Sequence, residues 1–527
     1  MFSLYCGLRA RRRVTVALLA VFLFPLGGSA RGQGPVKPAA TALMRGSGEA
    51  ASTTFQAALA DLNAFASKHG GRVSALAVDL ASGAPQGEWQ AKLELNPAST
   101  MKLLTAAAAL ELLGPSYQFQ TGLYGVPRPV VSPTPESPSS ALQVDELVLR
   151  GDGDPTLEVQ DLWRLANALA NMGVTQVGKL FVDQSRFDQR FVPPGFEQQP
   201  NEWAAFRAPV SAIALNRNSV TLNVLPTQPG RPARLWIEPP SAVSLDGTVS
   251  SVDKGNAKVN FQVVPSGLGD APPVAKVSGH LPIGQGRARY TRRMDDPTLT
   301  AGFSLRDLLR QHGITVGDVT TGGQHEKRRI TYHASPPLSA IVHALGKDSD
   351  NFTAEMLLKT LATVQVGADG RAPVGSSTQG AEVVRNWLSK LEGFEGHPHI
   401  RNGSGLFDAN RLSAAQLVAV LRHAYRTPSV HPDFVAQLSE GGVDGTLRAR
   451  FREPNVRGRV RAKTGTLQRV VSLCGYALRD GIEAPVAFAI LVTDVDGKHA
   501  ELRALVDKAV ATLLPPRPPG PSSTPSP

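Results

Sequence analysis

Cysteine is scarce in this chain of 527 residues, which contains only Cys6 and Cys474. Two cysteines exclude a multi-disulfide framework and a cysteine-rich zinc site. Hydrophobic residues make up 42% of the sequence and charged residues 19%, close to ordinary globular usage, so wholesale disorder is also excluded. The length corresponds to about three to four domain-sized units, enough to bury a large core.

Long apolar runs are also rare, and the clearest one, at residues 14–26, follows four arginines within residues 9–13. A basic segment, a short apolar segment and small residues before a cleavage point are typical of a secretory signal peptide. We expect residues 1–30 to be removed, which takes away Cys6 and changes the net charge from +11 to +7. An uncleaved anchor is the alternative, but the run is short for the roughly 20 residues that a spanning helix needs.

Interleaved aromatic and basic residues, which would line a nucleic-acid groove, are absent. The remaining positive charge suits an anionic cell envelope, so we expect no nucleic-acid partner. No later segment is long and apolar enough to span a membrane. We therefore expect an exported protein of the periplasm, or of the cell envelope or extracellular space, with no stable transmembrane segment after signal cleavage.

Composition and periodicity divide the mature chain into segments. Helical spacing begins near Thr53 and returns near Leu338, whereas short strand-like runs dominate from Asp145 to about Gly323. A loop rich in Pro and Ser covers residues 126–140. The expected segments are a flexible linker at 31–52, a first part at 53–124, a β-rich insertion at 125–330, a second part at 331–514 and a disordered Pro-rich tail at 515–527.

Individual elements are also predicted within these segments. Apolar residues at helical spacing and flanking glycines or turns mark their limits. The expected elements are a helix from residue 55 that stops before 70, a strand at 72–80, helices at 100–113, 338–345 and 352–361, a hairpin within 470–495 and a last helix around 502–513.

A Ser-x-x-Lys pattern at Ser99 and Lys102 is the first candidate for chemistry. Residues at i and i+3 lie on the same side of a helix, so the lysine amine can accept the proton of the serine hydroxyl. Asn96 and Pro97 mark the helix start, where free amides favour developing negative charge. A second copy at residues 251–254 has no apolar helix behind it, and we expect a solvated turn there.

Two more motifs follow in chain order, Ser349-Asp350-Asn351 and Lys463-Thr464-Gly465-Thr466. The Ser and Asn of the first are expected to enter one cleft, because residues two apart in an extended turn point to one side. The second ends a strand-like run at 457–462, where glycine lets a substrate approach the backbone and the Lys and Thr side chains can hold a carboxylate. Serine β-lactamases and penicillin-binding proteins combine these three motifs.

With this trio the sequence resembles the D-alanyl-D-alanine carboxypeptidases and endopeptidases of the S13 type, the class C low-molecular-mass penicillin-binding proteins. The resemblance covers about residues 55–514 and extends to the long gap between the first two motifs, where this family inserts extra domains. It departs at Asn402, where the family often has Asp, and in the loop after Tyr124, which is longer than usual. Further similar blocks are GDGDPTL at 151–157, VDQSRFD at 182–188, APVSAIALNRNSV at 208–220, SPPLSAIVHALGKDSDNFTAEMLLKTL at 335–361, NGSGL at 402–406 and GGVDGTLRARF at 441–451.

The resemblance implies an α/β (α+β) fold, in which a serine β-lactamase or penicillin-binding transpeptidase-like domain is interrupted by a β-rich insertion. It implies that Ser99 is the acylated nucleophile, Lys102 its general base and Ser349 the relay of a proton to the leaving amine. The implied substrate-binding residues are Asn351 for the substrate amide, Lys463, Thr464 and Thr466 for the terminal carboxylate, Gly465 beside them, and the amides of Ser99 and Thr466 as the oxyanion hole. Neither a cofactor nor a metal is implied.

This chemistry requires a Lys102 amine that is substantially neutral, which burial and repulsion from Lys463 would provide. The implied function is a serine-type D-Ala-D-Ala carboxypeptidase or endopeptidase that acts on peptidoglycan stem peptides and is acylated by β-lactam antibiotics. A serine β-lactamase and a catalytically silent peptidoglycan-binding protein are the alternatives. The intact trio argues against the silent protein.

Three other patterns receive a structural interpretation. Glu382 and Asn386 are spaced as a surface i,i+4 helix pair rather than as a deacylating site. Residues 152–158 resemble a calcium loop, but Pro155 interrupts it and the required glycine is missing. The His-Pro-His at 397–399 has no third metal ligand in view, which favours a loop.

Overall fold

The structure, a computed structural model, describes residues 40–130, 141–266, 271–323, 328–364, 372–481 and 484–517, with side chains from residue 53 onward. The expected signal peptide, most of the Pro/Ser-rich loop and most of the C-terminal tail lie outside the described residues. The chain divides into two compact units between Gly46 and Ser47, and every contact below lies within the second unit. In the part of the chain that is described, no helix is both long and apolar enough to cross a membrane.

One antiparallel sheet joins the beginning and the end of the folded chain. Its strand order is β17-β18-β19-β20-β1-β2, and β1 pairs along its whole length with β20. Residues far apart in sequence therefore share one sheet, as expected for a domain that is interrupted by an insertion. The strands are β1 (Arg72–Asp79), β2 (Pro85–Trp89), β17 (Ser439–Glu440), β18 (Val460–Leu467), β19 (Val470–Ala477) and β20 (Val486–Thr493).

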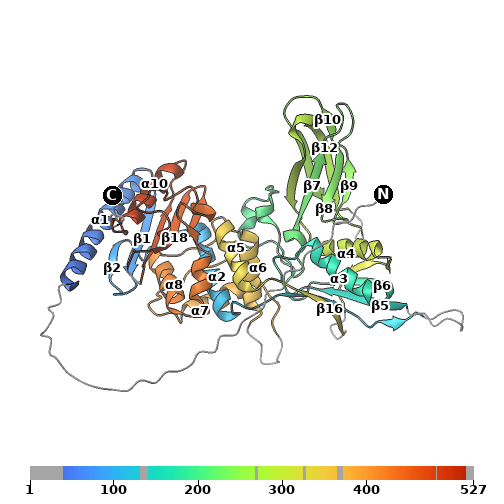
Figure 1. Cartoon of the computed structure of the whole chain (residues 1–527), viewed down its shortest axis with the longest axis horizontal. Coiled ribbons are helices and arrows are strands. Elements are labelled where there is room, and N and C mark those ends of the chain that lie inside the picture. Colours follow the sequence, from blue (N-terminus) through green and yellow to red (C-terminus); the bar gives the residue numbers. More distant parts are fainter. Residues whose placement is uncertain are drawn as a thin grey trace, which may run out of the picture. The chain divides into compact units, whose positions relative to one another are not determined.

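Helices cover both faces of this sheet (Figure 1). Along β20, Phe488 and Ile490 pack with the first and last helices, whereas Ala487 and Ala489 pack with the other helices. Both faces are buried, which explains why β20 reads as an unbroken apolar run rather than as an alternating one. The helices are α1 (Ala40–Lys68) and α10 (His499–Ala511) on one face, and α2 (Lys102–Leu112), α5 (Leu338–Asp348), α6 (Asn351–Ala362), α7 (Ser377–Leu388), α8 (Ala414–Arg426) and α9 (His431–Ala436) on the other.

The elements predicted for this part of the chain are confirmed, apart from the start of α1. The helix begins at Ala40, within the segment 31–52 that the sequence led us to expect as a linker, rather than near Thr53. Alanines are frequent in this segment and favour a helix, although Gly46 and Gly48 lie among them.

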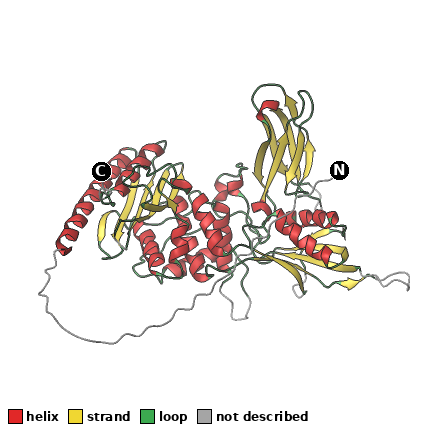
Figure 2. Cartoon of the chain, viewed as in Figure 1, coloured by secondary structure: helices red, strands yellow, loops and turns green. Residues whose placement is uncertain are grey.

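The described residues of the inserted part form three further sheets (Figure 2). One core cluster lies between the largest of these sheets and two helices, and a second joins the two smaller sheets. The largest sheet has the order β14-β6-β5-β3-β16, with β15 on β6 and β4 on β5. The other two follow the orders β13-β7-β8 and β10-β12-β11, the latter with β9 on β12. The strands are β3 (Gln120–Tyr124), β4 (Arg128–Pro129), β5 (Leu142–Arg150), β6 (Val174–Asp183), β7 (Ser219–Leu225), β8 (Arg234–Glu238), β9 (Ser244–Gly247), β10 (Ser250–Val252), β11 (Lys258–Val264), β12 (Val274–Pro282), β13 (Ala288–Arg293), β14 (Thr315–Val316), β15 (Val319–Thr321) and β16 (Arg329–Ala334).

The structure differs from the sequence reading of this insertion in two ways. First, it contains the helices α3 (Val159–Asn171) and α4 (Thr300–Gln311), which the emphasis on strand-like runs overlooked. A capping box between Glu158 and Asp161 marks the start of α3, but Glu-x-x-Asp is not the Ser/Thr-x-x-Glu/Gln pattern by which such a box is recognised in a sequence. Second, β3 and β16 pair with each other inside the largest inserted sheet, although both were assigned mainly to the flanking segments.

Candidate active site

Ser99 and Lys102 lie on one short helical turn at the edge of the sheet. Ser99 belongs to the 3-10 helix η1 (Ala98–Met101), and Lys102 is the first residue of α2. The Lys102 side chain is 1% exposed, and its Nζ lies 2.9 Å from Ser99 Oγ. Nζ also donates to Asn351 Oδ1 at 2.7 Å and to the Ser404 carbonyl at 2.7 Å. The predicted approach of amine and hydroxyl is therefore present.

The Ser349-Asp350-Asn351 motif forms the tight turn between α5 and α6. Ser349 adopts the left-handed conformation, with φ 57° and ψ 41°, rather than the extended turn that we expected. For a residue with a Cβ this conformation is strained, and such strain often accompanies functional sites. Asp350 caps α6 by accepting from Phe352 N, and Asn351 begins the helix. The turn presents Asn351 to Lys102 and Ser349 to Lys463.

The third motif occupies the C-terminal half of β18, so it ends a strand as the sequence predicted. Lys463 is fully buried, and its Nζ donates to Ser349 Oγ at 2.6 Å and to the Thr464 carbonyl at 3.0 Å. The hydroxyl of Thr464 donates to Thr446 Oγ1 at 2.9 Å. Thr466 is exposed at the end of the motif. The structure thus brings all three sequence motifs into one site.

Gly465 allows the close packing of β18 against η1. A Cβ at this position would lie 2.2 Å from Ser472 Oγ, 2.9 Å from the Pro97 carbonyl oxygen and 3.0 Å from Ala98 Cβ. Ser472 is buried on β19 and donates its hydroxyl to the Pro97 carbonyl at 2.8 Å. The glycine and this hydrogen bond therefore hold the Ser99 turn against the sheet, a role that the sequence reading did not foresee.

Burial alters the proton affinity of both lysines. Desolvation lowers the pKa of Lys102 to about 7, although the nearby negative charges of Glu355 and Asp350 act in the opposite direction. Desolvation also lowers the pKa of Lys463 well below its ordinary value, and repulsion from Lys102 adds to this. Desolvation lowers the pKa of Lys102, as expected. Repulsion between the two lysines, however, lowers the pKa of Lys463 rather than that of Lys102. A lysine with a pKa near 7 can act as a base at neutral pH.

Four residues that support the site received no role from the sequence. Glu355, Ser404 and Thr446 lie within segments that resemble the family, at 335–361, 402–406 and 441–451. Similarity of a segment does not indicate which of its side chains point into the site. A glutamate within the apolar run of α6 was the strongest available signal, because such residues are rarely buried without a partner. Ser472 stands in an apolar strand, and nothing in the sequence marks it.

Asn402, where the resembled family often has Asp, is buried and holds its loop in shape. Its Nδ2 donates to the carbonyls of Pro194 and Leu406, and its Oδ1 accepts from Gly405 N. A carboxylate has no N–H to donate, so the amide suits the two carbonyl contacts.

The other patterns singled out in the sequence lie outside the site formed by the three motifs. Glu382 and Asn386 are exposed on α7, as predicted. Ser251 is fully buried on β10 and its Oγ accepts from Thr227 N, so the expected solvated turn is wrong for this serine and applies only to the residues after β10. Asp152 pairs with Arg186. Within the described ranges, no group of three or more His, Cys, Asp and Glu side chains is placed to hold a metal ion.

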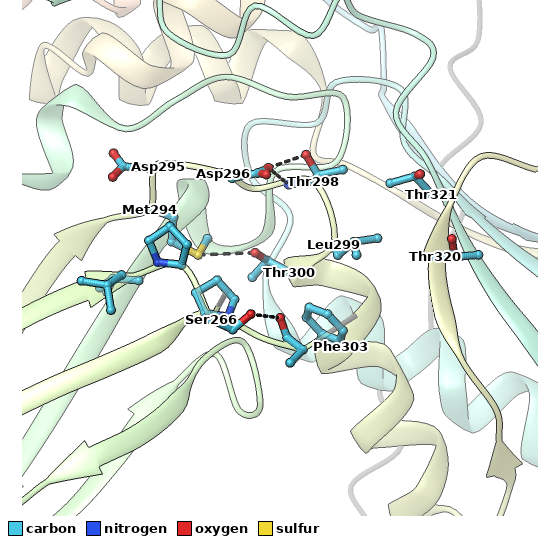
Figure 3. A pocket seen from close by; sticks show the side chains of 15 residues that line it. Ser266, Met294, Asp295, Asp296, Thr298, Leu299, Thr300, Phe303, Thr320 and Thr321 are labelled. Atoms are coloured by element: carbon cyan, nitrogen blue, oxygen red, sulfur yellow. Dashed lines mark hydrogen bonds between the residues drawn. The ribbon is translucent and has the colours of Figure 1, made fainter. Parts of the chain in front are cut away.

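A cavity of about 540 Å³ lies in the insertion, away from the three motifs (Figure 3). Several of its polar side chains bond to one another or to the adjacent backbone: Thr300 Oγ1 donates to Met294 Sδ, Thr298 to Asp296, and Ser266 Oγ to the Ala271 carbonyl. No residue of the trio lines it.

A serine beside a buried lysine of lowered pKa, a Ser-x-Asn turn and a Lys-Thr-Gly strand together define an active-site serine enzyme of the penicillin-recognising class. Comparison with known families agrees: the model of the D-Ala-D-Ala carboxypeptidase 3 (S13) family matches residues 55–512. The chain belongs to this family. It is a peptidoglycan-acting serine peptidase of the D-Ala-D-Ala carboxypeptidase type.

Individual relatives support this assignment. The chain is 31% identical over 455 residues to a D-alanyl-D-alanine carboxypeptidase of Actinomadura sp., covering 83% of this chain and 80% of the relative. It is 24% identical over 387 residues to the D-alanyl-D-alanine carboxypeptidase DacB of Haemophilus influenzae, covering 72% and 76%. The crystal structure of penicillin binding protein 4 (dacB) from Haemophilus influenzae has the same fold, with a TM-score of 0.69 at 22% identity, and covers 86% of this chain and 98% of that one.

Proposed function

We propose that Ser99 is the nucleophile of this peptidase and Lys102 its general base. The observation that carries the proposal is the 2.9 Å contact between Lys102 Nζ and Ser99 Oγ, made by a buried amine whose pKa is lowered to about 7. Neutral Lys102 accepts the Ser99 proton while Oγ attacks the carbonyl carbon of the penultimate D-alanine. The new bond gives a tetrahedral intermediate with a negatively charged oxygen.

The backbone amides of Ser99 and Thr466 stabilise that oxygen in the proposed reaction. Ser349 relays a proton to the amine of the terminal D-alanine, so the C–N bond breaks and D-alanine leaves. Its contact with Lys463, which is close to Lys102, supports a relay between the two lysines. Water then attacks the acyl-enzyme and returns Ser99 to its free form, and Asn351 holds the substrate amide throughout.

Lys463, Thr464 and Thr466 bind the terminal carboxylate in this proposal, with Gly465 beside them. Burial and repulsion from Lys102 lower the pKa of Lys463, so its ammonium form is disfavoured in the free enzyme. An arriving carboxylate supplies a compensating anion and favours protonated Lys463. This coupling would make the free carboxylate a strong determinant of acylation.

We infer that peptidoglycan stem peptides are the substrates, that β-lactams acylate Ser99, and that endopeptidase action on cross-links accompanies carboxypeptidase action. Family membership supports the first two inferences. The pattern at residues 1–30 supports export to the periplasm. The separate cores of the insertion support its treatment as inserted domains, with limits just before β3 and just after β16.

The test is to incubate the purified mature chain with defined muropeptides and to weigh the products. Loss of the terminal D-alanine from monomers identifies a carboxypeptidase, and separation of cross-linked dimers identifies an endopeptidase. A Ser99→Ala variant is the control and should leave both substrates intact. Unchanged muropeptides with the wild type would contradict the proposal, and fast turnover of penicillin without peptide cleavage would instead identify a β-lactamase.

A further inference from the structure

Helix α6 (Figure 1) carries Asn351, Glu355 and Lys359 at i, i+4 and i+8, a spacing that places them along one face of the helix. Asn351 accepts from Lys102, and Lys359 donates to Asp188 at 2.6 Å and to the Arg190 carbonyl at 2.9 Å. Glu355 lies between them and is 1% exposed. One face of α6 thus carries a contact with Lys102, a buried carboxylate and a contact with the insertion.

Glu355 holds the loop that contacts the catalytic lysine. Its Oε2 accepts from Gly403 N at 3.1 Å and its Oε1 accepts from Ser404 N at 2.8 Å. The carbonyl of Ser404, which follows directly in the chain, accepts from Lys102 Nζ at 2.7 Å. Thr105 Oγ1 on α2 also donates to the Gly403 carbonyl. One carboxylate therefore fixes the backbone segment that orients Lys102.

The geometry favours the ionised form of Glu355, because each of its oxygens accepts from a backbone N–H. Desolvation by burial is the largest effect and raises the pKa of Glu355 above its ordinary value, whereas the hydrogen bonds from Ser404 and Gly403 and the attraction of Lys102 act in the opposite direction. A buried negative charge beside Lys102 stabilises the ammonium form of that lysine.

Other charged groups around Lys102 come from the neighbouring elements. Asp350, which precedes α6, also favours the ammonium, but it is held by Arg217 at 3.3 Å and by the start of the helix. Lys463 on β18 interacts with Lys102 by repulsion. Glu355 both stabilises the ammonium form of Lys102 by its charge and is connected to Lys102 by hydrogen bonds through the backbone of Ser404.

We propose that Glu355 is a positioning residue of the peptidase, which orients Lys102 through the Ser404 carbonyl and, by its charge, sets the pH range in which Lys102 acts as a base. The inference rests on the proposed role of Lys102. The direction of the expected change follows from the charge. Removal of the negative charge makes the ammonium form of Lys102 less stable, so Lys102 becomes neutral at a lower pH.

The experiment is to measure the second-order rate of acylation by labelled penicillin from pH 5 to pH 10, on the full mature chain. For Glu355→Gln we expect the acid limb to move downward by about 1 pH unit, the size of a neighbouring-charge effect. We also expect the plateau to fall by about tenfold, because the amide can accept only one of the two N–H bonds and the loop shifts. Glu382→Gln, on the exposed face of α7, is the matched control and should behave as wild type.

A second pair of variants separates charge from geometry. Glu355→Asp keeps the charge and should retain the wild-type acid limb while its plateau falls. Ser404→Ala keeps the carboxylate but removes a hydroxyl that favours its ionised form, and should give a smaller downward movement of the limb. This variant also serves if Glu355→Gln fails to fold.

An acid limb that stays in place or moves upward in folded Glu355→Gln, or in Ser404→Ala where Glu355→Gln does not fold, would overturn the proposal and leave Glu355 a purely structural residue. Lys102→Ala distinguishes this failure from failure of the proposed function. If Lys102→Ala loses acylation while Glu355→Gln keeps the wild-type limb, only the role of Glu355 is wrong. If Lys102→Ala acylates normally, the base itself has been misassigned.

Discussion

Replacement of Gly465 by alanine tests how closely the site depends on the packing of β18 against the Ser99 turn. The added Cβ would lie 2.2 Å from Ser472 Oγ and 2.9 Å from the Pro97 carbonyl oxygen. Neither atom belongs to the end of a long flexible side chain. The strand and η1 must therefore move apart, and Ser472 must rotate away from its hydrogen bond with Pro97.

The size of the effect follows from these distances. Non-bonded heavy atoms prefer separations of about 3.5 Å, so relief of the contact with Ser472 requires a movement of about 1 Å. Overpacking of this kind costs about 1–3 kcal/mol of unfolding free energy. A misplacement of about 1 Å at reacting groups lowers the rate by about 100-fold. We expect Gly465→Ala to fold with reduced stability and to acylate about 100 times more slowly.

The assay combines urea unfolding with the rate of acylation by labelled penicillin. Gly284→Ala is the matched control, because a Cβ there has no neighbour within 4 Å and the backbone conformation is ordinary. Adding Ser472→Ala to Gly465→Ala removes the nearest clash and should recover part of the rate. Acylation at the wild-type rate by Gly465→Ala would refute the packing argument.

Three further outcomes are expected. Acylation should increase as the pH rises through about 7, because the neutral form of Lys102 is the base; a midpoint near the ordinary lysine pKa of 10.5 would show that the amine is not desolvated during catalysis. Against a peptide with a free terminal carboxylate, kcat/KM should decrease in the order wild type, Lys463→Arg, Lys463→Gln, and an amidated peptide should lose less from the Gln change; equal losses on both peptides would remove the carboxylate from the role of Lys463. Lys359→Met should lower the unfolding free energy by about 3 kcal/mol, because it leaves Asp188 of the insertion without its buried partner; an unchanged urea midpoint and slope would argue against that ion pair.

Periodicity predicted the long strands β1, β19 and β20 and the helices α2, α5, α6 and α10 of the main domain, but the short strands β2 and β17 and the helices α8 and α9 were not predicted. It was less successful in the insertion. The helix α3 shows helical spacing at Leu162, Leu165 and Leu169, but it lies between two apolar strands whose signal dominated the reading. The pairing of β3 with β16 joins residues about 200 positions apart, and local pattern carries no information on such a register.

Within the site, the sequence predicted which motifs meet but not what holds them. The contacts of Lys102 and Lys463 follow from three short motifs, each with a recognisable composition. The support from Glu355 and Ser472 depends on which face of a helix or strand turns inward, and that is decided by the packing of the whole domain. The pKa of a buried lysine likewise depends on neighbours that are distant in sequence.

The central claim is that Ser99 forms the acyl-enzyme, and peptide mapping after reaction with labelled penicillin tests it most directly. The wild type should carry one label on the peptide that contains Ser99, whereas Lys102→Ala, still folded, should acquire it slower by several orders of magnitude, as expected when the base is removed. A label on Ser251, or no label on a folded wild-type chain, would contradict the assignment.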